Sequence, residues 1–481
     1  MRYFLLLFLF ASTYIAQIID TNKIDSFINK TRERLNLQTG FSISVVVKDS
    51  IIYKKGYGYI DIDNKTNTTS ETPFYIASAT KSFVAALNKI LMNEKVIDID
   101  EPISTYLPDF KFQTKPLDTE TISIRDLLTH KHGIVSLPAV LRTAFTGDYT
   151  KEKLFELYQN AEFTGVNFKY SNDGYVFNSL ILEKVTGKTW QNLLEEKIFI
   201  PLEMNNTSSK VSDYTSLVLP KAYSTINGEI RELPFLKEDK TMHAAGGIIS
   251  TAEDLSNWLI FNLGNEEFNS KKILPKSDLD EIHSAQVNCE KTFWKYNRYS
   301  YGLGWYLSDY NGETLIHHFG GYTGAKSHIS FMPEYKIGIV ALTNDEGDGY
   351  YLTEIAADYV YNLFTGKDAD QIAEEELKII LNNQEEANSV EKEEKSKIKS
   401  DWNSELLVGE YYSEDFGQVV INENLHLKFG NLNGDLIPSD NKKFICDLKA
   451  FRLKVEFTEE DGKVIELILH GPTSLVFQKV K

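Results

Sequence analysis

The chain has 481 residues, of which 42% are hydrophobic and 25% charged, a composition typical of globular proteins that is long enough for two or more domains. Its 69 acidic residues outnumber its 51 basic residues, which gives a formal net charge of −18. We therefore expect no nucleic-acid partner, because phosphate binding needs basic surface and none is concentrated along this chain.

The N-terminus begins with a short apolar stretch. Residues 1–17 read MRYFLLLFLFASTYIAQ, with one arginine before the apolar run and small or polar residues after it. This pattern is typical of a secretory signal peptide, and the run is too short to span a bilayer comfortably. We predict a signal peptide over residues 1–16 and export to the periplasm or the extracellular space. If the signal stays uncleaved, it becomes a membrane anchor; no later segment predicts a membrane span in the mature chain.

Alternating and helical patterns follow in chain order. Residues 41–62 alternate in character around a polar turn and predict a β-hairpin, and the helix that follows contains Ser78. Residues 150–263 show several helical patterns, in which Gly187 closes one helix and Thr189 caps the next. Strands return at three segments, which read TLIHHF, KSHISFM and KIGIVALTN, and a final helix is expected in YLTEIAADYVYNLF. The fold class is therefore α+β, with an antiparallel sheet and an all-helical region.

The C-terminal part predicts a separate module. Residues 384–402 are almost wholly polar or charged, which predicts a solvated helix or linker between a domain over 17–383 and a domain over 403–481. The last domain consists of short alternating strands, and we expect a small all-β barrel or sandwich. The two cysteines, Cys289 and Cys446, fall in different domains, so two unpaired buried thiols are expected.

The first motif that could carry chemistry is Ser78-Ala79-Thr80-Lys81, at the start of an amphipathic helix. Residues three apart share one helix face, so the hydroxyl of Ser78 and the amine of Lys81 can meet. A lysine can activate a serine if burial lowers its pKa from about 10.4. Four residues of this type also occur by chance, as a capping serine and a surface lysine, so the motif needs support from the rest of the chain.

The second motif is Tyr170-Ser171-Asn172. A phenol near a cation can act as an acid or base toward a leaving group, and the adjacent amide can bind a substrate carbonyl. The alternative is an ordinary loop in which Asn172 or Asp173 caps the next helix.

The third motif is His318-Phe319-Gly320. On a strand, His317 and His318 point to opposite faces, so at most one of them lines a shared cleft. The glycines Gly320 and Gly321 let a substrate approach the backbone, whose N–H groups could stabilise an oxyanion. A lone histidine here could instead be a structural residue.

The order of these motifs, with H-x-G in place of K-T-G, resembles the serine β-lactamase and penicillin-binding protein superfamily in its class C-like branch. Further segments resemble that branch over roughly residues 25–365, among them ISIRDLLTHKHGI, AAGGIISTAEDLSNWL and YGLGWY. The C-terminal module resembles a small β domain that often follows such hydrolases.

The resemblance implies a role for each motif residue. Ser78 is the acylated nucleophile, Lys81 its base, Tyr170 the proton shuttle and Asn172 the residue that orients the substrate amide. His318 stands where the family usually has lysine, and the N–H groups of Ser78 and Gly321 form the oxyanion hole. Because a histidine is mostly neutral at pH 7, carboxylate recognition by this motif is in doubt. Within the family, the histidine form resembles esterases, D-amino-acid peptidases and amidases more than dedicated β-lactamases.

We therefore predict a serine hydrolase that acts through an acyl-enzyme on an amide, lactam or ester bond of a small-molecule or peptide substrate, without cofactor or metal. A metal enzyme is the first alternative, because His130 and His132 form an H-x-H pair, but no H-E-x-x-H occurs. An α/β-hydrolase is a second, and its G-x-S-x-G motif is absent. A penicillin-binding-type receptor with weak or no turnover remains open, and the sequence leaves the oligomeric state undetermined.

Overall fold

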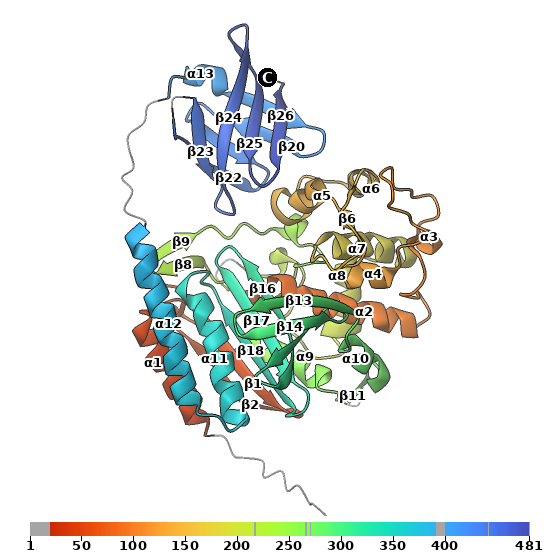
Figure 1. The fold of residues 1–481 in the computed structure, drawn as a ribbon, viewed down its shortest axis with the longest axis vertical. Helices are drawn as coiled ribbons and strands as arrows, with labels where there is room; N and C mark the ends of the chain where they lie inside the picture. The colour runs from red at the N-terminus through yellow and green to blue at the C-terminus, as the bar shows by residue number, and fades with distance from the viewer. Residues whose placement is uncertain are drawn as a thin grey trace, which may run out of the picture.

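A computed structural model describes residues 20–215, 218–264, 267–269, 271–390, 400–440 and 442–480. The predicted signal peptide over residues 1–16 lies outside the described residues. Figure 1 shows a larger α+β part and, above it, a smaller all-β part at the C-terminal end of the chain.

An eight-stranded antiparallel sheet forms the centre of the larger part, in the strand order β13-β14-β15-β16-β17-β18-β1-β2. Its strands are β1 (Phe41–Val47), β2 (Ser50–Tyr57), β13 (Val287–Phe293), β14 (Tyr296–Tyr301), β15 (Tyr306–Tyr310), β16 (Glu313–Tyr322), β17 (Ala325–Met332) and β18 (Ile337–Thr343). The first strand lies beside the last one, with Phe41 opposite Thr343. Both β1 and β18 are buried almost throughout because helices cover the two faces of the sheet, which explains their nearly continuous apolar sequences.

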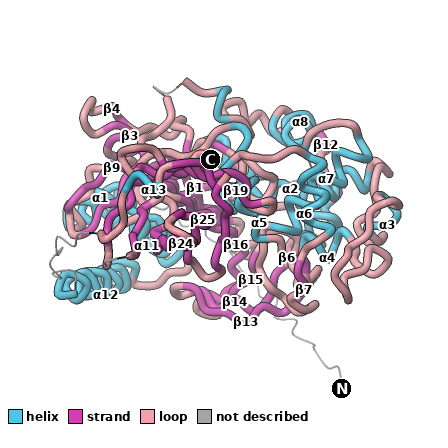
Figure 2. Tube along the Cα trace, turned by 90° about the horizontal axis from the view of Figure 1, so that it is seen from above, coloured by secondary structure: helices cyan, strands magenta, loops and turns pink. Residues whose placement is uncertain are grey.

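Three helices cover one face of the sheet, and the helical region covers the other. The first group is α1 (Thr21–Arg34), α11 (Asp348–Phe364) and α12 (Ala369–Val390). Figure 2 shows this group on one side of the strands and most of the other helices on the opposite side. The helix α12, which the sequence analysis did not assign, continues past Gln384, the start of the predicted charged segment.

The helical region lies between β2 and β13 in the sequence. Its helices are α2 (Thr80–Asn93), α3 (Ile103–Tyr106), α4 (Ile124–Leu128), α5 (Leu137–Leu141), α6 (Lys151–Gln159), α7 (Asp173–Thr186), α8 (Trp190–Leu194), α9 (Ala252–Asn262) and α10 (Lys276–Ile282). As predicted, α7 ends at Gly187 in the left-handed conformation, and the side chain of Thr189 caps α8 by accepting the Asn192 N–H. The apolar stripe of α2 is buried in a core shared with these helices and the sheet.

Short helical turns and two-stranded ribbons connect these elements. The turns are η1 (Ala77–Ala79), η2 (Arg142–Thr146), η3 (Glu195–Phe199), η4 (Val211–Asp213) and η5 (Asp239–Thr241). The ribbon strands are β3 (Tyr59–Asp61), β4 (Thr66–Asn67), β5 (Phe74–Tyr75), β6 (Ile134–Val135), β7 (Glu162–Phe163), β8 (Ala222–Ile226), β9 (Glu229–Leu233), β10 (Ile249–Ser250), β11 (Glu267–Phe268) and β12 (Lys271–Lys272). Among the described residues, no helix is both long and apolar enough to cross a membrane.

The C-terminal part is a closed antiparallel barrel of eight strands, so of the two predicted alternatives the barrel is present. It consists of α13 (Ser404–Leu407), β19 (Gly409–Ser413), β20 (Gly417–Ile421), β21 (His426–Phe429), β22 (Leu432–Pro438), β23 (Lys443–Asp447), β24 (Arg452–Glu460), β25 (Lys463–His470) and β26 (Ser474–Lys479). Cys446 is buried in the barrel and Cys289 in the larger part, and both are free thiols, as predicted.

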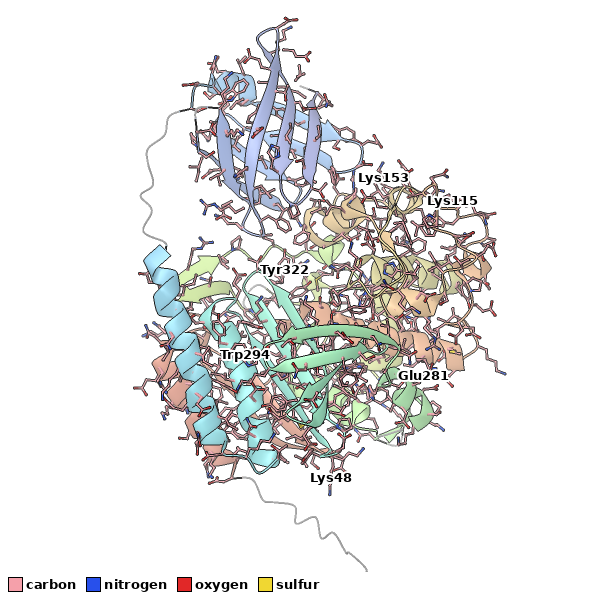
Figure 3. The ribbon with its side chains drawn as sticks, viewed as in Figure 1. Lys48, Lys115, Lys153, Glu281, Trp294 and Tyr322 are labelled. Carbon is pink, nitrogen blue, oxygen red and sulfur yellow. The ribbon has the colours of Figure 1, made fainter. Side chains whose placement is uncertain are left out.

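The barrel packs on the helical region through η2. The buried side chain of Arg142 donates hydrogen bonds to the carbonyl oxygens of Asp415 (2.7 Å) and Glu414 (3.1 Å). The ring of Phe145 lies 4.6 Å from that of Phe451 and 6.0 Å from that of Tyr322 at the end of β16. Figure 3 shows Tyr322 directly beneath the barrel and Lys153, which forms an ion pair with Glu414, beside it.

The Arg142 contact gives a prediction about stability. We expect Arg142→Met to lower the free energy of unfolding by about 2–3 kcal/mol, because the carbonyls of Glu414 and Asp415 lose the charged donors of a buried side chain while the bulk of that side chain is kept. Urea denaturation followed by tryptophan fluorescence measures this. The control is Arg231→Met at the same interface, where Arg231 is 65% exposed and lies 4.0 Å from Asp447, so a loss of at most about 0.5 kcal/mol is expected. Equal losses in the two variants would contradict the assignment.

Candidate active site

The segment before Ser78 is fixed in a strained conformation. Ala77 has a φ of 47°, which is uncommon for a residue with a Cβ atom. Its neighbour Ile76 donates its N–H to the carbonyl oxygen of Ile248 and accepts a hydrogen bond from the Ser327 hydroxyl (2.8 Å). The surrounding structure therefore holds Ser78 in η1, at the N-terminal end of α2, in an arrangement that the local chain alone disfavours.

The amine of Lys81 is fully buried beside the Ser78 hydroxyl. Its Nζ atom lies 3.2 Å from Ser78 Oγ, 2.9 Å from Asn172 Oδ1 and 2.7 Å from the carbonyl oxygen of Ala245. Burial lowers the pKa of Lys81 well below its ordinary value, so the neutral amine is favoured. While the amine is protonated, all three oxygens can accept a hydrogen bond from it; once it is neutral, Asn172 and Ala245 can hold its two N–H bonds, which leaves the lone pair for the Ser78 hydroxyl. This arrangement is suited to removing the proton of Ser78.

Tyr170 and Asn172 come to this site from the loop before α7. Asn172 stands at the N-cap position of α7 but makes no capping hydrogen bond, because its side chain accepts from Lys81 instead. Lys81 Nζ lies 4.8 Å from the centre of the Tyr170 ring. Although 37% of Tyr170 is exposed, lost hydration raises the pKa of its phenol well above 10, and the interaction with Ser78 only partly offsets this. Tyr170 therefore carries its proton at neutral pH.

His130 positions Tyr170. The two rings lie 4.5 Å apart, and Nδ1 of His130 accepts a hydrogen bond from the Ser171 N–H (3.2 Å). Nδ1 of His132 accepts from the Ile134 N–H (3.0 Å), so these histidines of the H-x-H pair each bind backbone. In the part of the chain that the structure describes, no group of three or more His, Cys, Asp or Glu side chains is placed to hold a metal ion.

His318 faces the site as a neutral imidazole. Its Nδ1 lies 3.0 Å from the Phe319 carbonyl oxygen, which can only accept, so Nδ1 carries the hydrogen and Nε2 is an acceptor. Burial lowers the pKa of His318 well below 6.5, and Lys81 lowers it further whenever its amine is protonated. His317 lies on the other face of β16, where Nε2 is 2.8 Å from the Ser308 hydroxyl. His318 thus supplies no positive charge for an anionic substrate.

Gly320 and Gly321 lie on β16 next to η1. A Cβ atom at Gly320 would fall 1.9 Å from the Ile76 carbonyl oxygen, so only glycine permits this approach of the two backbones. β16 therefore lies against η1, the turn that contains Ser78, and Gly321 is the next residue of that strand. The backbone N–H groups of Ser78 and Gly321 are therefore the candidate donors to an oxyanion.

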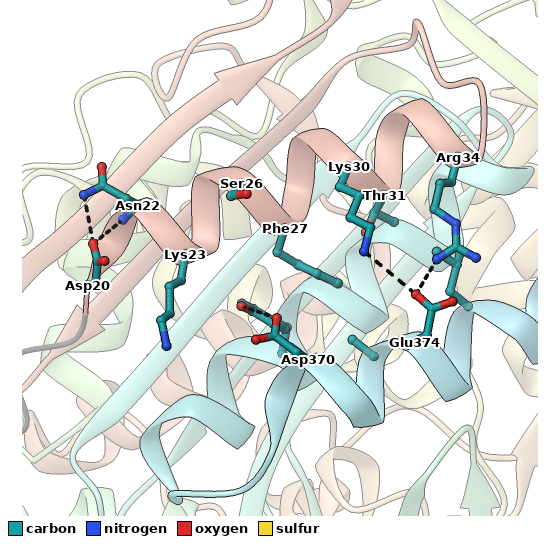
Figure 4. A pocket seen from close by; sticks show the side chains of 13 residues that line it. Asp20, Asn22, Lys23, Ser26, Phe27, Lys30, Thr31, Arg34, Asp370 and Glu374 are labelled. Atoms are coloured by element: carbon teal, nitrogen blue, oxygen red, sulfur yellow. Dashed lines mark hydrogen bonds and ion pairs between the residues drawn. The ribbon is translucent and has the colours of Figure 1, made fainter.

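Cavities of similar size occur at the site and away from it. About 450 Å³ of space is bounded by Phe168, Tyr170, Cys289 and Tyr306 with their neighbours, next to the motif residues. Another cavity of about 440 Å³ lies between α1 and α12, on the opposite face of the sheet, and is lined by Lys30, Arg34 and Glu374, which form ion pairs (Figure 4). The second cavity holds none of the three motifs.

The structure thus brings together Ser78, Lys81, Tyr170, Asn172 and His318, whereas the ring of Phe319 stacks on His317 on the other face of β16. Two contributors were not predicted from the sequence: the carbonyl oxygen of Ala245 and the ring of His130. The first belongs to the backbone, which no residue type reveals, although its segment AAGG was one of those that resembled the family. The second was visible only as half of an H-x-H pair.

Comparisons with known proteins show the family of this chain. A family model described as Beta-lactamase matches residues 30–359. Protein flp of Staphylococcus aureus strain COL is 27% identical over 340 residues, which cover 67% of this chain and 62% of protein flp. The chain therefore spans about three fifths of the length of this curated relative.

Solved structures share the fold. The octameric penicillin-binding protein homologue from Pyrococcus abyssi is similar with a TM-score of 0.62 and 22% identity, over 96% of this chain and 100% of that chain. The D-amino acid amidase from Ochrobactrum anthropi SV3 in complex with L-phenylalanine gives a TM-score of 0.57 and 23% identity, over 69% of this chain and 96% of the amidase.

The contact between Gly320 and Ile76 gives a prediction about reactivity. In Gly320→Ala the new methyl group must push β16 away from η1, so we expect the rate at which a fluorophosphonate labels Ser78 to fall roughly 100-fold. Stability should fall by about 1–3 kcal/mol. The control is Gly471→Ala in the barrel, where the nearest atom would be 3.5 Å from the new Cβ. Unchanged labelling in Gly320→Ala would mean that the two backbones are not in this contact.

Asp173 gives a prediction about pH. It is buried next to Asn172, and burial raises its pKa from 3.8 to about 6. Because the folded-state pKa lies above that of the unfolded chain, the protonated carboxyl stabilises the fold below about pH 4, and this contribution is lost as the pH rises through about 6. Asp173→Asn cannot titrate, so its melting temperature relative to wild type should rise by roughly 2–4 °C between about pH 4 and pH 7. The exposed Asp109→Asn should show no such trend.

Proposed function

The chain belongs to the β-lactamase family, and from this premise we propose that it is a serine hydrolase that cleaves amide, lactam or ester bonds through an acyl-enzyme. The observation that carries the proposal is the fully buried amine of Lys81, whose Nζ lies 3.2 Å from Ser78 Oγ and is held in place by the oxygens of Asn172 and Ala245. A structural lysine has no need to be held neutral beside a serine hydroxyl, whereas a general base does.

Acylation begins at Ser78. Its Oγ attacks the carbonyl carbon of the substrate, its proton passes to Lys81, and the N–H groups of Ser78 and Gly321 stabilise the negative charge on the carbonyl oxygen. The phenol of Tyr170 donates its proton to the leaving group as the bond breaks, and the proton on Lys81 restores the phenol.

Deacylation runs through the same groups. Water attacks the acyl-enzyme ester and gives up a proton to the Tyr170 and Lys81 pair. This proton passes to Ser78 Oγ as the ester bond breaks, which releases the acid and restores the free Ser78 hydroxyl. All the proton-transferring groups of this cycle are side chains of the chain itself.

The neutral His318 bears on the class of substrate. An imidazole acceptor suits an N–H or O–H group of the substrate better than a carboxylate at this position. One structural neighbour is a D-amino acid amidase, which supports an amide among the candidate substrates. The class C-like assignment, and the choice among lactam, D-amino-acid peptide and ester, belong to this proposal as well.

The proposal is tested by intact mass spectrometry of the protein after exposure to a fluorophosphonate and, separately, to a β-lactam. We expect one adduct from each reagent on wild type and none on Ser78→Ala, while the half-buried Ser104→Ala labels like wild type. Lys81→Arg should slow labelling by roughly 10²–10⁴-fold, because a guanidinium stays protonated and cannot act as the base.

The fate of the adduct separates enzyme from receptor. Loss of the β-lactam adduct with release of hydrolysed product supports a hydrolase, and an adduct that persists for hours supports a penicillin-binding-type receptor with weak turnover. Absence of any adduct from both reagents contradicts an activated Ser78.

A further inference from the structure

Arg298 on β14 is a buried cation without an anionic partner. The residue is 9% exposed, and its guanidinium carbon lies 3.9 Å from the centre of the Tyr306 ring and 4.4 Å from that of Phe293. Its Nε atom is buried without a hydrogen-bond partner. Among the described residues no carboxylate lies within ion-pair distance of it, and Glu354, whose charge is felt at Arg298, is engaged by His328. A buried charge of this kind is costly unless something pairs with it.

A second cation lies directly opposite Arg298. In the pairing of β13 with β14, Lys291 is the partner of Arg298, and it too has no ion pair among the described residues. Like charges directly opposite each other on neighbouring strands destabilise a sheet, and an anion between them removes the repulsion. The pairing is notable in a chain whose net charge is −18. Arg298 and Lys291 line a common cavity at this edge of the sheet. Glu290 and Asp309 also line it, but neither forms an ion pair with these cations.

The two cations lie beside the candidate active site. Tyr306, on which Arg298 stacks, has its ring centre 6.1 Å from that of Tyr170, with the rings nearly parallel, and 5.7 Å from that of His318. Lys291 borders both the cavity at Tyr170 and the neighbouring cavity of about 440 Å³ that Arg298 lines. Because Tyr170 protonates the leaving group in the proposed reaction, this pair lies on the leaving-group side.

We propose that Arg298 and Lys291 form a binding subsite for a carboxylate on the leaving group of the substrate, an inference that rests on the proposed hydrolase function. The planar guanidinium is suited to a bidentate contact with a carboxylate, and its stacking between two rings fixes its orientation before the substrate arrives. Lys291 adds a second charge at the open edge. The subsite supplies the charge that the neutral His318 lacks, and it selects an acidic leaving group such as a free C-terminal amino acid.

The test uses two thioesters that differ only in this charge: N-benzoylglycyl thioglycolate and its methyl ester. Binding to Ser78→Ala is measured by calorimetry, so that no turnover is needed. We expect the acid to bind at least tenfold more tightly than the methyl ester. Adding Arg298→Met should weaken binding of the acid 10- to 50-fold and that of the methyl ester less than twofold, and adding Lys291→Met should weaken the acid about threefold.

Two further variants control for folding. Arg32 is also 9% exposed, but its guanidinium donates to the carbonyl oxygens of Leu37 and Thr39, so Arg32→Met should keep the preference for the acid. Arg298→Lys retains the charge without the planar fork and should retain part of the preference. If Arg298→Met does not fold, Arg298→Lys and Lys291→Met provide the test. A reduced preference for the acid in these two variants supports the subsite, and an unchanged preference contradicts it.

The inference is overturned if the Ser78→Ala variant, with Arg298 and Lys291 intact, binds the acid and its methyl ester equally or binds neither. It is also overturned if the preference for the acid survives the addition of Arg298→Met. These outcomes are independent of the proposed function, which stands or falls with the fluorophosphonate adduct on Ser78. A labelled Ser78 without a preference for the acid leaves a hydrolase whose leaving group needs no carboxylate.

Discussion

The burial of one amine governs the construction of this site. Lys81 can take the proton of Ser78 only if its amine is neutral and its lone pair points toward the Ser78 hydroxyl. A lysine on the surface stays charged and has no fixed orientation. Burial lowers the pKa of Lys81 and so favours loss of the charge, and acceptors from two distant segments, Asn172 before α7 and Ala245 before β10, hold the amine in place. The helical region, the loop before α9 and the sheet must therefore all meet at α2, which explains why this helix lies in the middle of the larger core.

Much of this arrangement could be predicted from the sequence, because it depends on local chemistry. The end of α7 at Gly187 and the start of α8 after Thr189 follow from capping preferences, and the spacing of Ser78 and Lys81 follows from the helix repeat. What could not be predicted depends on distant contacts. The carbonyl oxygen of Ala245 is the same in every residue type, and the packing of His130 on Tyr170 depends on the folded loop. Closure of the barrel, likewise, depends on strand register rather than on any single segment.

Side-chain contacts connect the barrel to β16, the strand that carries His318 and Gly321. Tyr322, at the end of β16, follows Gly321 directly and contacts Phe145, which in turn packs on Phe451 of the barrel. The hydrogen bonds of Arg142 hold the barrel at the same turn, η2. A displacement of the barrel would thus be felt one residue away from a candidate oxyanion donor. The barrel therefore supports the segment that carries the candidate oxyanion donor, and it is packed on the larger part rather than attached only through the linker.

The pairing of β1 with β18 has a consequence for how the chain folds during its synthesis. The ribosome releases β1, β2 and the helix with Ser78 early, but their sheet neighbour β18 and the strand β16 emerge only after the whole helical region. Until then β1 lacks its neighbour β18, and α2 can pack only on the helical region and not on the sheet strands that emerge later, and such apolar surfaces are prone to aggregation. The nascent chain therefore depends on chaperones or on rapid compaction of the helical region, and a product truncated before β18 carries the nucleophile without a site to use it.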